Sequence, residues 1–279
     1  MKLFIKILVI SSIYLPFGDL QAQLYVDPNT SQNDLIQSIV GENVSISNVV
    51  LNCNSNAFGT FEGYSSNLGI DSGIILSTGN ALGAVGPNNS GSTSGQNNYS
   101  GDADLNAIIS PNVTEDACVL EFDIAPDCDT LGIRFVFGSE EYPEYVNSYN
   151  DAFAFFISGP SMPQQNIALL PNSNTPVTIS NVNNGTTNNG PCSNCNYYIP
   201  NGTGAFSQSQ YNDPNVIEYD GFTIPLLAKI AVNPCDTYHM KLAIADAGDD
   251  SFDSGVFIEA KGLSCISNKS VEMRIDSLV

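Results

Sequence analysis

The sequence predicts an all-β fold, a large antiparallel β-sandwich of which the jelly roll is one form, with one short N-terminal helix. Several stretches alternate apolar and polar residues, which is the two-residue period of a strand with one buried face. Segments rich in Asn, Ser, Gly and Thr separate these stretches, as turns do. The 14 Phe and 12 Tyr supply apolar volume for one sizeable core, so we expect residues 23–265 to form a single domain.

Residues 1–22 have the form of a secretory signal peptide. Lys2 and Lys6 make its beginning basic, and an apolar stretch over residues 3–16 follows. That stretch falls short of the roughly 20 residues that a membrane-spanning helix needs. Ala22 offers a small residue for cleavage, and the alternative is an uncleaved anchor. We therefore expect an extracellular or cell-surface protein that does not insert into the membrane once the signal is removed.

The formal net charge of −21 restricts the classes of partner. No Lys or Arg occurs between Lys6 and Arg134, or between Arg134 and Lys229. Because nucleic acids and anionic membranes attract basic surfaces, we expect neither as a partner. Such acidity fits an extracellular protein that holds divalent cations or depends on its charge for solubility.

The first third of the chain predicts the helix and then strands. The helix covers residues 31–40, with Asn29 or Thr30 as its N-cap and Gly41 as its end. Strands are expected, in order, over residues 44–51, over 58–64 and at the end of 68–79.

A polar loop over residues 87–101 separates these strands from a short apolar segment, residues 105–109. Asp102 and Asp104 stand between the two. They either add ligands to an acidic edge or cap the apolar segment as the start of a helix. We favour capping, because aspartate side chains accept hydrogen bonds from the first N–H groups of a helix.

Two segments of the second half resemble each other, residues 128–159 and 235–262. Each starts with Cys-Asp-Thr, continues as a strand, crosses an acidic loop and ends in a second strand. The first strands, 131–138 and 238–245, alternate in the same register from the cysteine onward. The second strands are expected over residues 152–159 and 254–262.

The acidic loops of these segments, residues 139–151 and 246–253, contain no Lys or Arg. Crowded carboxylates repel one another unless they take up protons or bind a cation. Ca²⁺ takes roughly 6–8 oxygen ligands, so such loops suit it. We therefore expect a Ca²⁺ site at one edge of the sandwich, formed by Glu140, Glu141, Asp151, Asp246, Asp249, Asp250 and Asp253. The alternative is that both loops are solvated turns of an acidic protein.

Seven cysteines in an exported chain predict disulfides. Cys192 and Cys195 are expected to pair locally, because this C-x-x-C lacks the second pair of a zinc site and the helix of a redox motif. Cys128 and Cys235 head the two similar segments, so a bridge between them is one candidate. The odd count leaves at least one thiol unpaired or paired with another molecule.

Longer motifs carry a family resemblance. They are SGIILSTG at residues 72–79, FVFGSEEYPE at 135–144, NDAFAFFISGP at 150–160 and DSGVFIEA at 253–260. With the N-terminal strand and helix, they resemble the choice-of-anchor L domain of bacterial surface proteins over residues 24–265. The resemblance implies an exported, β-rich surface module in adhesion or matrix contact, and it supplies no catalytic residues or ligand set. Residues 266–279 are expected to be a tail or linker, of a stand-alone secreted member or of a fragment of a longer anchored protein.

The polar segment over residues 160–225 lies between the two similar segments, and long loops on a rigid sandwich often carry recognition. Aromatic faces bury area against sugars and peptides. Five rings of this segment are therefore candidates to contact an extracellular carbohydrate or protein ligand: Tyr197, Tyr198, Phe206, Tyr211 and Tyr219. The alternative is that the rings pin the segment to the sheet.

Together these observations predict a binding or adhesion module, stabilised by Ca²⁺, rather than an enzyme. The alternative is a secreted carbohydrate-active hydrolase using the acidic-loop carboxylates, two of which would have to flank a sugar cleft at a set separation. His239, the single histidine, falls on the outward face of its strand, and no G-x-S-x-G motif accompanies it. The identity of the ligand and the oligomeric state stay open.

Overall fold

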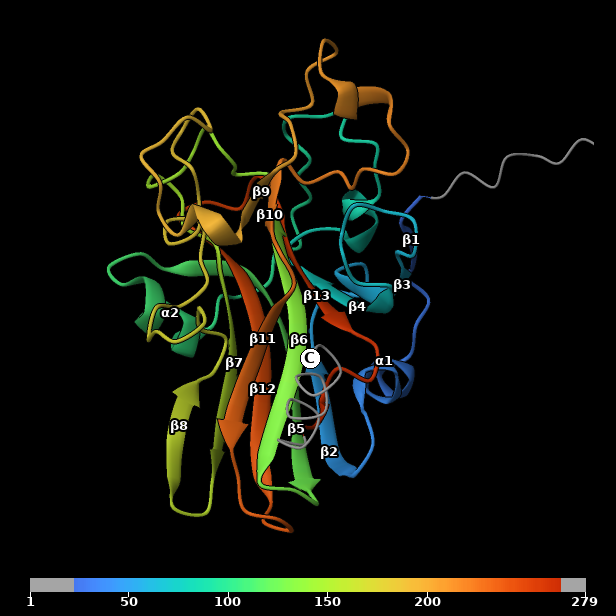
Figure 1. Cartoon of the computed structure of the whole chain (residues 1–279), viewed down its shortest axis with the longest axis vertical. Coiled ribbons are helices and arrows are strands. Elements are labelled where there is room, and N and C mark those ends of the chain that lie inside the picture. Colours follow the sequence, from blue (N-terminus) through green and yellow to red (C-terminus); the bar gives the residue numbers. More distant parts are fainter. Residues whose placement is uncertain (1–22, 267–279) are drawn as a thin grey trace, which may run out of the picture.

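Two antiparallel sheets pack face to face in the computed structural model, which describes residues 23–266 (Figure 1). The larger sheet has the order β1 (Tyr25–Asp27), β3 (Phe58–Glu62), β4 (Ser72–Ser77), β13 (Ser254–Glu259), β6 (Thr130–Ser139), β10 (Gly221–Thr223) and β9 (Tyr198–Pro200). β6 also pairs with β11 (Leu226–Ala231) and β14 (Ser264–Cys265). The smaller sheet has the order β2 (Val44–Asn52), β5 (Thr114–Pro126), β12 (Tyr238–Ala247), β7 (Ala152–Gly159) and β8 (Met162–Asn166). The predicted all-β sandwich is confirmed.

Alternation along β6 gives the larger sheet an inner face, toward the smaller sheet, and an outer face. Phe135 and Phe137 point inward and pack against Phe153 of β7, with ring centroids 4.9 and 5.3 Å apart. Val136 points outward into a second apolar cluster, which includes Phe257 of β13. Residues that continue these two rows beyond the end of β6 therefore point into different surroundings.

The predicted N-terminal helix is α1 (Gln32–Ile39), and it buries one face between the edges of the two sheets. Its N-cap is Ser31, whose hydroxyl accepts a hydrogen bond from Asp34 N, rather than Asn29 or Thr30. The strands predicted in the first third are present as β2, β3 and β4.

A second helix, α2 (Ala103–Ile109), lies on the outer face of the smaller sheet through Leu105. Asp102 Oδ1 accepts hydrogen bonds from Asp104 N and Leu105 N, at 3.0 and 3.1 Å. The capping role predicted for Asp102 is therefore confirmed. Three short 3₁₀ segments complete the helical part of residues 23–266: η1 (Ala81–Ala84), η2 (Cys195–Tyr197) and η3 (Ser209–Asn212).

The two similar segments are interleaved rather than side by side. Each sends one strand to each sheet: β6 and β13 pair in the larger sheet, and β12 and β7 pair in the smaller one. Both acidic loops therefore cross from one sheet to the other at the same end of the sandwich, the upper end in Figure 1.

Three disulfides join six of the seven cysteines. The local pair Cys192–Cys195 is confirmed. The candidate bridge from Cys128 to Cys235 is wrong, because β14 pairs with the start of β6 and brings Cys265 to Cys128. The third bridge joins Cys53 and Cys118, and Cys235 is the exposed free thiol of the described chain.

The signal peptide expected over residues 1–22 and most of the expected tail lie outside the described residues. Within residues 23–266, no helix is both long and apolar enough to cross a membrane.

Candidate functional site

Eight carboxylate side chains are buried at or near the end of the sandwich where the acidic loops cross. Each is at most 5% exposed: Asp116, Glu140, Glu141, Asp151, Glu218, Asp220, Asp246 and Asp253. Among residues 23–266, no Lys or Arg forms an ion pair with any of them; Arg134 pairs with Glu259, and Lys241 pairs with Asp102 and Asp104. Buried charge without a partner is costly, so this arrangement calls for a compensating group.

Three of these residues extend the apolar rows between the sheets. Ala245 of β12 pairs with Ala152 of β7, so the next residues, Asp246 and Asp151, stand opposite each other. Glu141 follows β6 on the side of Phe135 and Phe137, and therefore points between the sheets as well. We call Glu141, Asp151 and Asp246 the inner carboxylate group.

Only one member of the inner group is satisfied by hydrogen bonds. Asp151 accepts from Ala247 N at 2.9 Å and from the Ser254 hydroxyl at 2.7 Å. The four carboxylate oxygens of Glu141 and Asp246 have no hydrogen-bond partner within residues 23–266. Like charges directly opposite in a sheet destabilise it, so this group resists ionisation as it stands.

The surroundings favour the protonated form of all three inner acids. Burial, with the nearby charge of Asp151, raises the pKa of Glu141 to about 9. Burial raises the pKa of Asp151 to about 7 despite its two hydrogen bonds. Burial and the charge of Asp151 hold the pKa of Asp246 well above its usual range. Proton uptake or a bound cation would relieve this repulsion.

A second set of acids lies on the outer face of the larger sheet. Ser139 pairs with Gly221 on one side and with Ser254 on the other, so Glu140 stands between Asp220 and Asp253. Glu140 N donates a hydrogen bond to the Asp253 carbonyl at 3.1 Å. Glu218 precedes Asp220 by two residues. We call Glu140, Glu218, Asp220 and Asp253 the outer carboxylate group.

The polar loop over residues 87–101 covers the outer group and supplies most of its hydrogen bonds. Glu218 accepts from the backbone of Asn89 and Ser90, at 3.2 and 3.0 Å, and from the Thr93 hydroxyl at 2.9 Å. Asp253 accepts from Gly95 N at 2.9 Å. The same loop satisfies Asp116, which accepts from Asn97 N and Tyr99 N.

Glu140 is the exception in the outer group, because neither of its carboxylate oxygens has a hydrogen-bond partner in the described chain. Burial, with the charges of Asp220 and Glu218, raises its pKa to about 11. Burial also raises the pKa of Asp220 to about 8 and that of Asp253 to about 7.

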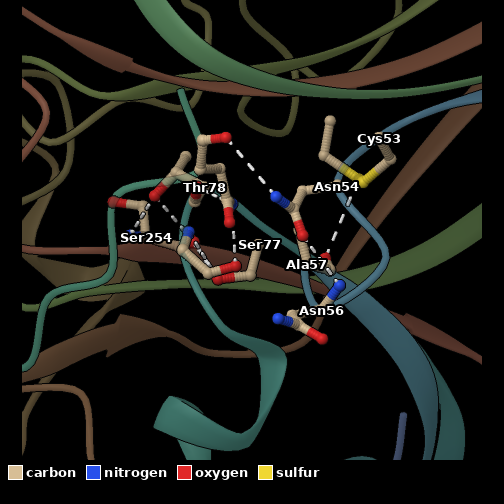
Figure 2. The surroundings of a disulfide bond; sticks show 10 residues. Cys53, Asn54, Asn56, Ala57, Ser77, Thr78 and Ser254 are labelled. Carbon is tan, nitrogen blue, oxygen red and sulfur yellow. Dashed lines mark hydrogen bonds between the residues drawn. A yellow bond between two sulfur atoms is a disulfide. The ribbon is translucent and has the colours of Figure 1, made fainter. Parts of the chain in front are cut away.

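Figure 2 shows the surroundings of the disulfide between Cys53 and Cys118, among them Ala57, Ser77 and Ser254. Cys118, bonded to Cys53, lies 3.8 Å from the Ala57 carbonyl, which accepts a hydrogen bond from Ser77 N at 2.8 Å. The Ser77 hydroxyl donates to the Ser254 carbonyl at 3.1 Å. Since the Ser254 hydroxyl reaches Asp151, one continuous network joins the disulfide to the inner group.

Residues 25–264 match the family model of the choice-of-anchor L domain. The chain belongs to the choice-of-anchor L domain family. The family indicates a module associated with the cell surface. No curated protein and no solved structure matches the chain.

In this choice-of-anchor L domain the predicted calcium ligands divide into three sets. Glu141, Asp151 and Asp246 meet in the inner group, whereas Glu140 and Asp253 belong to the outer group. The other two predicted ligands lie half-buried at the rim: Asp250 accepts from Gln96 Nε2 at 2.7 Å, and Asp249 from Ser251 N at 3.3 Å. Within residues 23–266, no three His, Cys, Asp or Glu side chains stand ready to coordinate one ion. An ion would have to draw them together by side-chain rotation.

Four residues at this end of the domain were not predicted from the sequence: Asp116, Glu218, Asp220 and Asn88. The amide Nδ2 of Asn88 donates a hydrogen bond to Asp220 Oδ1 at 2.8 Å. Glu218 and Asp220 lie in the bend before β10 and not in a strand, so alternation gave no signal for them.

The predicted aromatic surface also divides. Phe206 is 78% exposed, and its ring lies edge-on to Tyr211 with centroids 5.2 Å apart. Tyr198 is buried against Tyr142, with ring centroids 4.8 Å apart, and Tyr197 packs against the core. Phe206 is therefore the exposed ring of this set, the Tyr211 ring beside it is half-buried, and Tyr219 is buried.

Proposed function

We propose that this choice-of-anchor L domain is a cell-surface binding module whose acidic end is held together by Ca²⁺. The observation that carries the proposal is the pair Glu141 and Asp246. Both side chains are buried, all four of their oxygens lack hydrogen-bond partners within residues 23–266, and both lie beside Asp151.

The chemistry of the inner group favours Ca²⁺ over other cations. The group offers only oxygen donors, whereas zinc sites in proteins use His nitrogen and Cys sulfur. Ca²⁺ accepts an irregular shell of roughly 6–8 oxygens, so carboxylates, backbone carbonyls and water can complete it. Its double positive charge offsets the repulsion that otherwise favours protonation of these acids.

An ion in this position would join the two sheets. Glu141 lies in the loop that leaves the larger sheet, whereas Asp151 and Asp246 lie at the ends of strands in the smaller one. Coordination would therefore fix the separation of the sheets at the end that carries the long polar loops. A rigid end of this kind presents recognition loops at a lower entropic cost.

The ligand that we propose is an extracellular carbohydrate or protein, bound through Phe206 and Tyr211. The exposed Phe206 ring offers a flat apolar face, and the adjacent Tyr211 adds a hydroxyl. Burial of the inner acids argues against the alternative of a glycoside hydrolase. A sugar would have to reach Glu141 and Asp151, which are 0% and 1% exposed.

Calcium binding to the mature chain, residues 23–279, tests the cation. Metal-depleted protein should bind Ca²⁺ in a calorimetric titration, and its melting midpoint should be higher with Ca²⁺ than with EDTA. At 100 times the Kd, one ion adds about 2.7 kcal/mol, or roughly 5–11 °C for a domain of this size. Asp246→Asn should lose most of this gain. An unchanged midpoint with no bound metal would contradict the proposal.

Binding to immobilised glycans and matrix proteins tests the ligand. Wild type should bind in Ca²⁺ without releasing product, and Phe206→Ala should weaken that binding. Tyr64→Ala is the matched control, because Tyr64 is an exposed ring outside this loop. Equal losses in both variants would show that Phe206 has no special role.

A further inference from the structure

The geometry points to a second divalent-cation site on the outer face of the larger sheet, formed by Glu140, Asp220 and the amide oxygen of Asn88. It uses no residue of the inner group. It also deepens the proposed function, because it makes the order of the loop that carries Phe206 depend on the cation.

Strand register brings the two carboxylates together. Gly221 pairs with Ser139, so Asp220 and Glu140 stand opposite each other at the next position. Side chains opposite each other in an antiparallel pair have Cβ atoms about 4.5–5.5 Å apart. Both residues are 1% exposed, and both oxygens of Glu140 lack hydrogen-bond partners in the described chain.

The side chain of Asn88 supports this site independently of the carboxylates. Its Nδ2 donates to Asp220 Oδ1 at 2.8 Å and to the Asn201 carbonyl at 3.0 Å, which fixes the amide beside Asp220. Its Oδ1 is fully buried and has no partner within residues 23–266. A buried amide oxygen without a donor costs stability, and asparagine oxygens are common ligands of Ca²⁺.

Glu218 and Asp253 complete the surroundings of this site without being its free ligands. Hydrogen bonds from the loop over residues 87–101 already satisfy Glu218, and Gly95 N reaches Asp253. Their negative charge adds to the attraction for a cation, and no Lys or Arg of residues 23–266 pairs with either of them. All the donors near the site are oxygens, as a hard cation requires.

The site adjoins both ends of the loop that carries Phe206. Asn201, at the start of that loop, accepts from Asn88 and donates from Nδ2 to the carbonyls of Ile217 and Tyr219, at 2.8 and 2.7 Å. Further along, Gly204 packs so closely on the Ser90 backbone that a Cβ at this glycine would overlap it. An ion that fixes Asn88 and Asp220 would therefore fix residues 201–217 as well.

Stoichiometry separates the two sites. Calorimetric titration with Ca²⁺ alone should give two ions per wild-type chain, one in Asp220→Asn and one in Asp246→Asn. Both substitutions keep the side-chain shape and remove a buried charge, so we expect both variants to fold. Asn88→Ala, which removes the amide ligand without changing the charge, should weaken the ion that Asp220→Asn abolishes.

A tryptophan reporter tests the coupling to the loop. The chain contains no Trp, so Phe206→Trp gives a single emission signal from an exposed position. Ca²⁺ should raise the anisotropy of that emission in Phe206→Trp alone and when Asp246→Asn is added. Adding Asp220→Asn instead should abolish the rise.

The possible results distinguish failure of this site from failure of the inner one. One ion per chain, lost in Asp246→Asn and kept in Asp220→Asn, would overturn the second site and leave the first. One ion lost only in Asp220→Asn would support the second site and overturn the first. A tryptophan signal that ignores Asp220→Asn would refute the coupling to residues 201–217.

Discussion

Replacing Glu141 by glutamine tests whether the inner group is an uncompensated acid cluster in the metal-free protein. Glu141→Gln keeps the shape of the side chain and removes its charge. Burial and the charge of Asp151 raise the pKa of Glu141 from 4.5 to about 9. In EDTA at neutral pH, the folded protein therefore holds a proton that the unfolded chain releases.

The expected effect depends on pH. The stability contributed by a group whose pKa is raised on folding is complete below pH 4.5 and is lost as the pH rises toward 9. Since each pH unit corresponds to about 1.4 kcal/mol, wild type should lose at most about 2.7 kcal/mol between pH 5.5 and 7.5. Glu141→Gln has no ionisable group at this position, so it should not lose this stability. In EDTA, the wild-type midpoint should therefore fall relative to Glu141→Gln by roughly 5–11 °C over this range.

With Ca²⁺, the wild type should have a higher melting midpoint than Glu141→Gln. The ion stabilises the ionised carboxylates of the wild type, whereas Glu141→Gln offers one ligand fewer and should therefore gain less stability. Differential scanning calorimetry at both pH values, with EDTA and with Ca²⁺, gives all the comparisons. Asp127→Asn is the control, because Asp127 is exposed in the turn between β5 and β6, at the opposite end of the sandwich. If Glu141→Gln is destabilised equally at both pH values in EDTA, the reasoning is refuted.

Three further predictions concern the support of the site and the free thiol. Replacing Cys53 and Cys118 by alanine should lower the free energy of unfolding by about 4 kcal/mol, from their separation of 65 residues, in urea titrations; a loss below 1 kcal/mol would contradict this. Gly79→Ala should cost on the order of 1–3 kcal/mol in the same assay, because the new Cβ would overlap the Asp253 carboxylate; wild-type stability would refute the overlap. Thiol titration of the folded, unreduced chain should detect one reactive group and none in Cys235→Ser; any other count would contradict the disulfide pattern.

Local patterns were sufficient to predict most of the long strands, but the longest one, β5, was not predicted. Alternation from the two Cys-Asp-Thr starts gave β6 and β12, and the second strands of the segments are β7 and β13. The capping role of Asp102 was predicted because an aspartate side chain can accept hydrogen bonds from the first N–H groups of a helix. These features depend on neighbouring residues only, so the sequence contains what is needed to predict them.

Non-local pairing accounts for what could not be predicted. Cys265 reaches Cys128 because β14 pairs with β6, a contact between residues 137 apart in the chain. Asp220 reaches Glu140 through β10, a strand of three residues that gives no periodic signal of its own. The assignment of Glu140 and Glu141 to different groups could have been predicted, because adjacent residues that continue a strand point to opposite faces.

The interleaving of the two similar segments also constrains when the chain can fold. Within the described chain, every strand that pairs with β6 begins at or beyond Gly221. β7 lies between β8 and β12, so one of its two edges stays unpaired until β12 is present. Folding of the centre of both sheets must therefore wait until most of the domain has been synthesised. Domains dominated by such distant contacts fold slowly. A chain that stays open until its last strands emerge is suited to passage through a narrow translocation channel before it folds outside.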